Sequence, residues 1–199
     1  MKNKGSLLSE GAEAKVFIVK AFGMEILVKS RLPKDYRIKE IDDSIRKRRT
    51  KIESRVMYRL NRAGVRAPRL FAAGVFSIYY EKLDGKLMKD SSLGSKMLKK
   101  CGMLLAEIHN AGISHGDFTP ANIIISHGTP YVIDFGLSEV RNSSEEMGID
   151  LLLMKRSVSS SMFKKFMEGY AETARNPKPV IDRLEEIEKR GRYQIRTLG

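Results

Sequence analysis

The sequence predicts an α+β fold, with β-strands in the first 81 residues and helices in most of the remainder. Two stretches rich in β-branched and other apolar residues, 15–20 and 24–29, are predicted to pair as strands around a tight turn. Beyond the strand-rich part, helical spacing of apolar residues dominates at 94–111 and returns beyond residue 150. The 199 residues suffice to bury a core, as one compact domain or as two small lobes.

One long helix and two further strands are predicted between the strand pair and the later helices. The helix covers 44–63, and Gly64 and Pro68 end it. Its apolar stripe consists of Ile45, Ile52, Val56 and Leu60. Strands at 70–74 and 75–81 complete the β-rich part of the chain.

The helix predicted at 94–111 is closed by Gly112 and contains Cys101, the only cysteine of the chain. A single cysteine excludes an internal disulfide and a multi-cysteine zinc site. Cys101 shares helical spacing with apolar neighbours, so it is predicted as a core residue rather than a nucleophile. Three further helices are predicted, at 150–154, 162–174 and 180–190.

The segment from His115 to Gly136 carries the strongest chemical signal. Asp117 precedes Asn122 by five residues, and a second aspartate, Asp134, follows in an Asp-Phe-Gly sequence. This spacing is typical of the base and metal ligands of protein-kinase-type phosphoryl transfer. Mg²⁺ prefers hard oxygen ligands, so Asn122 and Asp134 are predicted to hold it. Asp117 is then left to accept a hydroxyl proton or to orient a water molecule.

A hairpin is predicted to hold Asn122 and Asp134 close together. Its two apolar runs, 123–125 and 131–133, flank the turn-like segment 126–130. An ordinary hairpin with polar ends is the simpler interpretation, but it does not explain three chemical elements in this order and spacing.

Parts of the first 85 residues are predicted to serve the same chemistry. Lys29 ends the second strand, where a lysine that reaches the α- and β-phosphates is expected. Glu53 on the long helix is the preferred partner of Lys29, and Glu40 is the competing candidate. The first loop, with one glycine in place of three, is predicted to cover the phosphates through Gly11, Ala12, Glu13 and Ala14. The backbone of the linker 81–85, at Glu81 and Leu83, is expected to face an adenine.

The formal net charge of +13 is unevenly placed along the chain. Residues 29–66 hold 14 Lys and Arg against 5 Asp and Glu, and residues 189–199 add basic residues without any acid. Such patches are typical of a polyanion partner, although a solvated helix face explains the charge equally well. The residues predicted to contact nucleic acid are Arg46, Lys47, Arg48, Arg49, Lys51, Arg190, Arg192 and Arg196.

No apolar run approaches the roughly 20 residues of a membrane helix, and Met1–Ser6 lacks a signal-peptide core. The composition, with 42% hydrophobic and 31% charged residues, is typical of a soluble globular protein. We therefore expect a cytoplasmic protein without a membrane partner.

The catalytic set of the eukaryotic-type protein kinase fold is similar to five residues of this chain: Lys29, Glu53, Asp117, Asn122 and Asp134. The match extends over nearly the whole chain, with departures. His-Gly-Asp stands in place of His-Arg-Asp, Thr119 stands where serine/threonine kinases often carry a lysine, and no Ala-Pro-Glu follows. The 63 residues after Gly136 leave little chain for a helical platform that holds a peptide.

With those departures, the chain resembles the small atypical kinase of the KEOPS complex. Its members share Gly-Ala-Glu-Ala in the first loop, then Val-Lys-Ser-Arg, then Lys-Asp-Tyr-Arg. This chain has all three, at 11–14, 28–31 and 34–37. The Arg-Gly-Arg at 190–192 is also similar to the family's C-terminal end, but the residues after it diverge.

The resemblance implies a bilobal protein-kinase-like fold, with a β-rich N-lobe at 1–81 and a reduced helical C-lobe at 82–199 that ends in a basic tail. It implies an enzyme that uses ATP and Mg²⁺ and acts mainly as an ATPase. The implied partners are a threonylcarbamoyl-transferase subunit, other KEOPS subunits and tRNA, in which the complex makes threonylcarbamoyladenosine.

Two other functions remain as alternatives. A small-molecule phosphotransferase of the aminoglycoside or choline kinase type also uses His-Gly-Asp and a downstream asparagine, but it generally needs a larger helical lobe. A non-catalytic subunit that holds tRNA on its basic surface agrees with the single-glycine loop, but not with the intact magnesium set.

Overall fold

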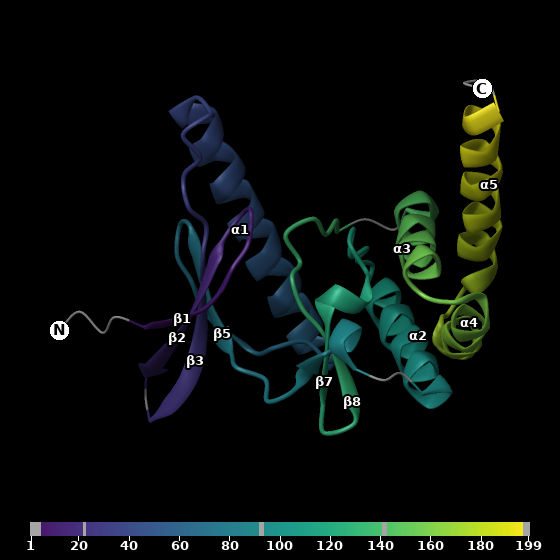
Figure 1. Ribbon diagram of the computed structural model, residues 1–199, viewed down its shortest axis with the longest axis horizontal. Helices are drawn as coiled ribbons and strands as arrows, with labels where there is room; N and C mark the ends of the chain where they lie inside the picture. Colours follow the sequence, from purple (N-terminus) through teal and green to yellow (C-terminus); the bar gives the residue numbers. More distant parts are fainter. Residues whose placement is uncertain (1–4, 22, 92–93, 141–142, 197–199) are drawn as a thin grey trace. The chain divides into compact units, whose positions relative to one another are not determined.

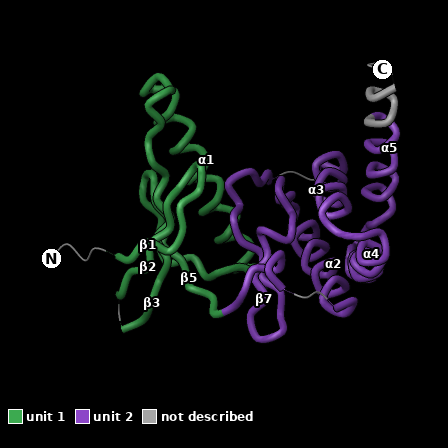
Figure 2. Tube along the Cα trace, in the orientation of Figure 1, with its two compact units in different colours: residues 1–84 green, residues 85–199 purple. Residues whose placement is uncertain are grey.

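The computed structural model describes the chain from residue 5 to residue 196, apart from residues 22, 92–93 and 141–142, with side chains up to residue 190. The chain forms two compact units, one up to Asp84 and one from Gly85 onward (Figure 1 and Figure 2). Each unit contains its own antiparallel sheet and its own helices.

The first unit is built on a five-stranded antiparallel sheet. Its strands are β1 (Ser6–Glu10), β2 (Lys15–Ala21), β3 (Met24–Ser30), β4 (Leu70–Ala73) and β5 (Ser77–Glu81), in the spatial order β1-β2-β3-β5-β4. β2 and β3 pair along their whole length, which confirms the predicted strand pair. The sequence pattern does not predict β1, because all five of its residues are exposed and no buried face imposes an alternation.

The long helix α1 (Lys39–Arg62) contacts β4 and β5. It begins five residues earlier than the apolar pattern predicts. The reason is that its first turns bury Asp42 in place of an apolar residue, and Arg37 and Arg46 pair with that carboxylate. Because a charged residue takes the buried position, the first turns of α1 show no apolar periodicity in the sequence.

The second unit contains a three-stranded antiparallel sheet of β6 (Lys86–Leu87), β7 (Ile123–Ser126) and β8 (Thr129–Val132), with the short helices η1 (Met88–Asp90) and η2 (Pro120–Asn122). β7 and β8 form the predicted hairpin. Its turn is tighter than expected and consists of His127 and Gly128, both at positive φ. Two such residues are typical of a two-residue turn that matches the strand twist.

Four helices complete the second unit: α2 (Ser95–Asn110), α3 (Ser144–Ser157), α4 (Ser160–Thr173) and α5 (Pro177–Arg196). α2 packs on α4, and α3 packs on α5. The predicted start of a helix at Asp150 is wrong, because α3 begins six residues earlier and buries Asp150 in its middle.

α2 and α4 meet backbone to backbone at two glycines. A Cβ atom on Gly102 would come well within 3.0 Å of the Phe166 carbonyl oxygen, and one on Gly169 would come equally close to the Lys99 carbonyl oxygen. Only glycine leaves room for this approach. The neighbouring Cys101 is fully buried, which confirms its predicted place in the core.

Within the described residues, we find no helix that combines the length and the apolar character needed to cross a membrane.

Candidate active site

Two predicted site residues meet within the first unit. Lys29 on β3 donates a hydrogen bond from Nζ to Oε1 of Glu53 on α1, at 2.8 Å. Their side chains are 9% and 3% exposed, so this is a buried ion pair. Glu40, the competing partner in the sequence, is exposed in the first turn of α1.

Glu53 has a second cationic partner, which the sequence reasoning missed. Arg31 Nη2 donates to Glu53 Oε2 at 2.6 Å, and the Arg31 side chain is 4% exposed. Lys29 and Arg31 lie two positions apart in an extended segment, where alternate side chains share a face. That spacing is the signal from which this contact could have been predicted. One carboxylate therefore bridges two buried cations.

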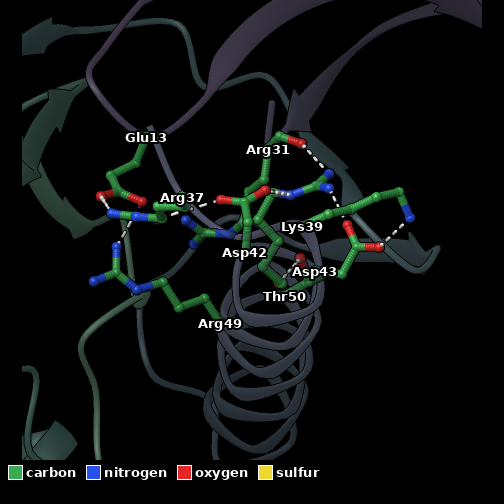
Figure 3. Close-up of polar contacts among 9 residues, drawn as sticks. Glu13, Arg31, Arg37, Lys39, Asp42, Asp43, Arg49 and Thr50 are labelled. Atoms are coloured by element: carbon green, nitrogen blue, oxygen red, sulfur yellow. Dashed lines mark hydrogen bonds and ion pairs between the residues drawn. The ribbon is translucent and has the colours of Figure 1, made fainter. Parts of the chain in front are cut away.

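The loop predicted to cover the phosphates connects β1 and β2. A hydrogen bond of 3.0 Å from the Gly11 N–H to the Ala14 carbonyl oxygen closes its turn, next to the exposed Ala12. The Glu13 carboxylate pairs with Arg49 of α1 at 2.8 Å and with Arg37 at 3.6 Å (Figure 3). These ion pairs tie the loop to α1 and to the segment that precedes it.

The two predicted linker residues differ in what their backbone can offer. Glu81 ends β5, and its N–H already donates to the Arg69 carbonyl oxygen at 2.9 Å. The Glu81 carboxylate in turn accepts from the Arg69 N–H at 3.0 Å. Leu83 lies beyond the strand and is half-buried, which makes it the stronger candidate for an adenine contact.

In the second unit, η2 brings Asn122 back onto Asp117. The Asn122 Nδ2 group donates to Asp117 Oδ2 at 2.8 Å and to the Asp117 carbonyl oxygen at 2.9 Å. The Asn122 N–H bonds to the Thr119 carbonyl oxygen at 2.9 Å and closes the turn. Because both amide hydrogens are used here, the side-chain oxygen of Asn122 is left to act as a metal ligand.

Asp134 lies two residues beyond β8 in the left-handed backbone conformation, with φ of 63°. Aspartate tolerates this conformation better than most residues. Its Oδ1 accepts from the Gly136 N–H at 3.3 Å. The N–H of the preceding Ile133 donates to the Asn122 carbonyl oxygen at 2.9 Å, so the hairpin holds Asn122 and Asp134 on adjoining segments.

His115, which is fully buried, joins these two segments. Its Nδ1 accepts from the Asp117 N–H at 3.2 Å, and its Nε2 bonds to the Ile133 carbonyl oxygen at 3.1 Å. A neutral imidazole that accepts at Nδ1 carries its proton on Nε2, where it donates. His115 therefore fixes the backbone on both sides of the site.

Asp150 supports the same loop, which the sequence pattern did not predict. Its carboxylate accepts from the N–H of His115 at 2.7 Å and from the N–H of Gly116 at 2.8 Å. His109 Nε2 is a further partner at 3.1 Å. The charged residue inside an apolar run was the available signal, because a buried carboxylate needs such donors.

Tyr170 extends this buried chain of hydrogen bonds. Its hydroxyl lies 2.8 Å from His109 Nδ1. Burial, and after it the charge of Asp150, raises the pKa of Tyr170 above its usual value. Because the Asp150 carboxylate accepts from His109 Nε2, a neutral His109 ring accepts at Nδ1 from the Tyr170 hydroxyl.

The donor atoms in the second unit fit a magnesium ion. Among the described residues, no group of three or more His, Cys, Asp and Glu side chains is arranged to hold a metal. Mg²⁺ usually takes only one or two carboxylates from a protein and completes its shell with phosphates and water. The carboxylate of Asp134 and the amide oxygen of Asn122 supply this kind of partial set.

The basic stretch on α1 includes an exposed part that fits the predicted nucleic-acid surface. Lys47, Arg48 and Lys51 are exposed, whereas Arg49 is half-buried and pairs with Glu13. We call Lys47, Arg48, Arg49 and Lys51 the basic face of α1.

Arg46 does not belong to this face. Its side chain is 11% exposed, and it pairs with Asp42 at 2.6 Å and with Asp43. Its guanidinium carbon also lies 4.0 Å from the centre of the Phe76 ring. The nucleic-acid contact expected of Arg46 stays a prediction, and its charge is already paired inside the first unit.

Of the predicted contacts near the C-terminus, Arg190 is exposed on α5 and donates to Glu145 at 2.8 Å. The side chains of Arg192 and Arg196 lie outside the described residues.

Solved structures share this fold. The Rio2 kinase from Chaetomium thermophilum, determined as an ADP/Mg²⁺-phosphoaspartate complex, matches with a TM-score of 0.68 over 95% of this chain and 71% of that chain, at 17% identity. WaaP in complex with acyl carrier protein matches with a TM-score of 0.61 over 94% and 88%, at 15% identity. The predicted α+β protein-kinase-like fold is confirmed.

A model of the RIO domain matches residues 18–176, and the chain therefore belongs to the RIO domain family of atypical kinases. Two relatives cover nearly the same length. The "Probable serine/threonine-protein kinase BUD32 homolog" of Archaeoglobus fulgidus is 38% identical over 94% of this chain and 96% of its own. The "KEOPS complex subunit Bud32" of Pyrococcus abyssi is 33% identical over 96% and 97%. The resemblance seen in the sequence is thereby confirmed.

A third relative is much longer. The "Probable bifunctional tRNA threonylcarbamoyladenosine biosynthesis protein" of Methanobrevibacter smithii is 36% identical over 97% of this chain, but the chain spans only 38% of that protein.

Proposed function

We propose that this protein is an Mg-ATP-dependent atypical serine/threonine kinase that works mainly as an ATPase subunit of a KEOPS complex during threonylcarbamoyladenosine modification of tRNA. The observation that carries the proposal is the pairing of Asn122 with Asp117 and Ile133, in a chain that matches a protein named a KEOPS subunit over nearly the whole of both chains. We expect it to act in the cytoplasm.

Asp117 is the base in this proposal, or the group that orients a water molecule. Asn122 occupies Oδ2 of Asp117, so Oδ1 is the oxygen that accepts a proton from the attacking hydroxyl or water. His115 and Asp150 hold the backbone around Asp117, which keeps that oxygen in place.

Asn122 and Asp134 are the residues that would hold Mg²⁺. The ion would neutralise charge on the phosphate oxygens during transfer. The hydrogen bonds that Asn122 Nδ2 donates to Asp117 turn the side-chain oxygen of Asn122 away from Asp117, and the hairpin holds Asn122 near Asp134. These contacts support Asn122 and Asp134 as the two proposed metal ligands.

Lys29 is proposed to bind the α- and β-phosphates, and Glu53 to hold Lys29. The buried pair at 2.8 Å supports this role. Gly11, Ala12, Glu13 and Ala14 would cover the phosphates, and Leu83 would offer backbone groups to the adenine.

The basic face of α1, together with Arg190, Arg192 and Arg196, is proposed to contact tRNA phosphates. A separate threonylcarbamoyl-transferase subunit is the proposed protein partner. The bifunctional relative supports this pairing, since a chain like this one accounts for 38% of a protein with two activities.

The proposal is tested by measuring ATP hydrolysis with Mg²⁺ by the purified protein, alone and with the transferase subunit and tRNA. Turnover that rises with partner or tRNA and disappears in Asp117→Asn supports a regulated ATPase. Phosphate found instead on an added aminoglycoside, choline or peptide, without any effect of tRNA, contradicts it. Unaffected tRNA modification by Asp117→Asn would indicate a non-catalytic scaffold.

A further inference from the structure

Glu53 divides its carboxylate between two cations, Lys29 on β3 and Arg31 one residue beyond the end of that strand. Oε1 accepts from Lys29 at 2.8 Å, and Oε2 accepts from Arg31 at 2.6 Å. All three side chains are at least nine-tenths buried. The orientation of Oε1 towards Lys29 therefore depends on what holds Oε2.

Arg31 is itself held on both sides of its backbone. Its N–H donates to the Phe76 carbonyl oxygen at 2.9 Å. Its carbonyl oxygen accepts from Arg46 at 3.3 Å, and Arg46 packs over the Phe76 ring. The labelled Arg31 and Asp42 in Figure 3 lie in this cluster, where Asp42 accepts from Arg46. The backbone of Arg31 is therefore held in place while its side chain contacts Glu53.

One hydrogen-bond donor of the Arg31 guanidinium is buried without a partner in the part of the chain that the structure describes, which is unfavourable for a residue that only stabilises the fold. Among the described residues, Arg31 Nε is the buried side-chain nitrogen or oxygen atom that lacks a hydrogen-bond partner. Burial of an unsatisfied donor costs stability. The guanidinium thus lies where it contacts Glu53, although its Nε atom is left without a partner among these residues.

We propose that Arg31 is a positioning residue for nucleotide binding. It holds Oε2 of Glu53 so that Oε1 keeps Lys29 in place for the nucleotide phosphates, and this inference rests on the roles proposed above for Lys29 and Glu53. Without Arg31, the carboxylate would rotate more freely and lose one of its two charge partners. We therefore expect a variant without Arg31 to remain folded but to hold Lys29 less firmly in position.

The first experiment compares KM for ATP and kcat for ATP hydrolysis in Arg31→Met and in wild type. KM should rise about tenfold or more, with kcat changed less than about threefold, because Arg31→Met removes a charge-assisted hydrogen bond that orients a phosphate-binding group. Arg31→Lys, which keeps a positive charge, should recover part of the loss. Arg62→Met, at an exposed arginine near the end of α1, is the matched control and should leave KM unchanged.

A double-mutant cycle with Glu53→Gln separates positioning from general destabilisation. If Arg31 acts through Glu53, adding Arg31→Met to Glu53→Gln should change KM less than about twofold. Should Arg31→Met fail to fold, Arg31→Lys takes its place in the same cycle.

A fall in kcat that follows the folded fraction, with KM unchanged, would show that Arg31 only stabilises the fold. Effects on KM that add fully in the double variant would also overturn the inference. An increase in KM for Glu53→Gln, but not for Arg31→Met, would overturn this inference alone. An unchanged KM in Glu53→Gln would remove the proposed role of Glu53 together with it.

Discussion

One side-chain amide, that of Asn122, donates both of its hydrogens to Asp117, to Oδ2 at 2.8 Å and to the carbonyl oxygen at 2.9 Å. The backbone carbonyl oxygen of Asn122 accepts a hydrogen bond from the Ile133 N–H. Asn122 therefore connects the proposed base to the segment that carries Asp134. Its substitution should affect both the base and the metal.

Asn122→Asp is expected to lower ATP turnover at least about a hundredfold, because it replaces the donor to Asp117 with a like charge. Single-turnover hydrolysis across a range of Mg²⁺ concentrations measures the loss and any change in metal dependence. Asn176→Asp, at an exposed asparagine, is the matched control. A variant with wild-type turnover at all Mg²⁺ concentrations would remove Asn122 from the site.

Asp150→Ala is expected to lower the free energy of unfolding by about 3 kcal/mol, because two buried backbone N–H groups and His109 lose their acceptor. Urea denaturation measures the change. Asp150→Asn keeps one acceptor oxygen and should lose less. A loss below about 1 kcal/mol for Asp150→Ala would mean that other groups replace the carboxylate.

Gly102→Ala is expected to lower the free energy of unfolding by about 2 kcal/mol or more, because the new methyl group meets the Phe166 carbonyl oxygen and forces α2 away from α4. Thermal unfolding measures the shift in Tm. Gly74→Ala, where the nearest atom lies 3.8 Å from the added Cβ, is the matched control and should change Tm little. Equal Tm values for the two variants would contradict the close helix contact.

The basic face of α1 should give tRNA binding a steep dependence on salt. Replacing Lys47, Arg48 and Lys51 with alanine should reduce the slope of log affinity against log salt by about 3, roughly 1 for each lysine or arginine that no longer neutralises a phosphate. Arg46→Ala should instead lower the stability of the first unit, because its ion pair with Asp42 is largely buried. If the tRNA affinity of the wild type does not depend on salt, these residues form an ordinary solvated helix face and do not contact phosphates.

Spacing along the chain was sufficient to predict the hairpin that joins Asn122 to Asp134, because short-range patterns report local structure directly. The pair of Lys29 and Glu53, which the structure shows, was also predicted, because the lysine ends an apolar strand and the glutamate lies within the stronger periodic pattern of the long helix. Both predictions depend on apolar patterns that lie close together along the chain.

Periodicity does not reveal which charges are buried together. Asp150 resembles an ordinary helix start in the sequence, yet it lies inside α3 and accepts from the loop of His115. Arg46 resembles a surface residue within a basic run, yet Asp42 and Phe76 enclose it. These partners are distant in sequence or hidden in a charged stretch, so only the folded chain shows them.

We propose above that the chain turns over Mg-ATP with Asp134 as a metal ligand. The most direct measurement is steady-state ATP hydrolysis by Asp134→Ala, with folding checked by circular dichroism and with Asp182→Ala, at an exposed aspartate of α5, as the control. We predict a fall of about a thousandfold or more in a folded protein, because the metal loses its carboxylate ligand. Turnover retained near the wild-type rate would show that Asp134 is not a metal ligand needed for ATP hydrolysis.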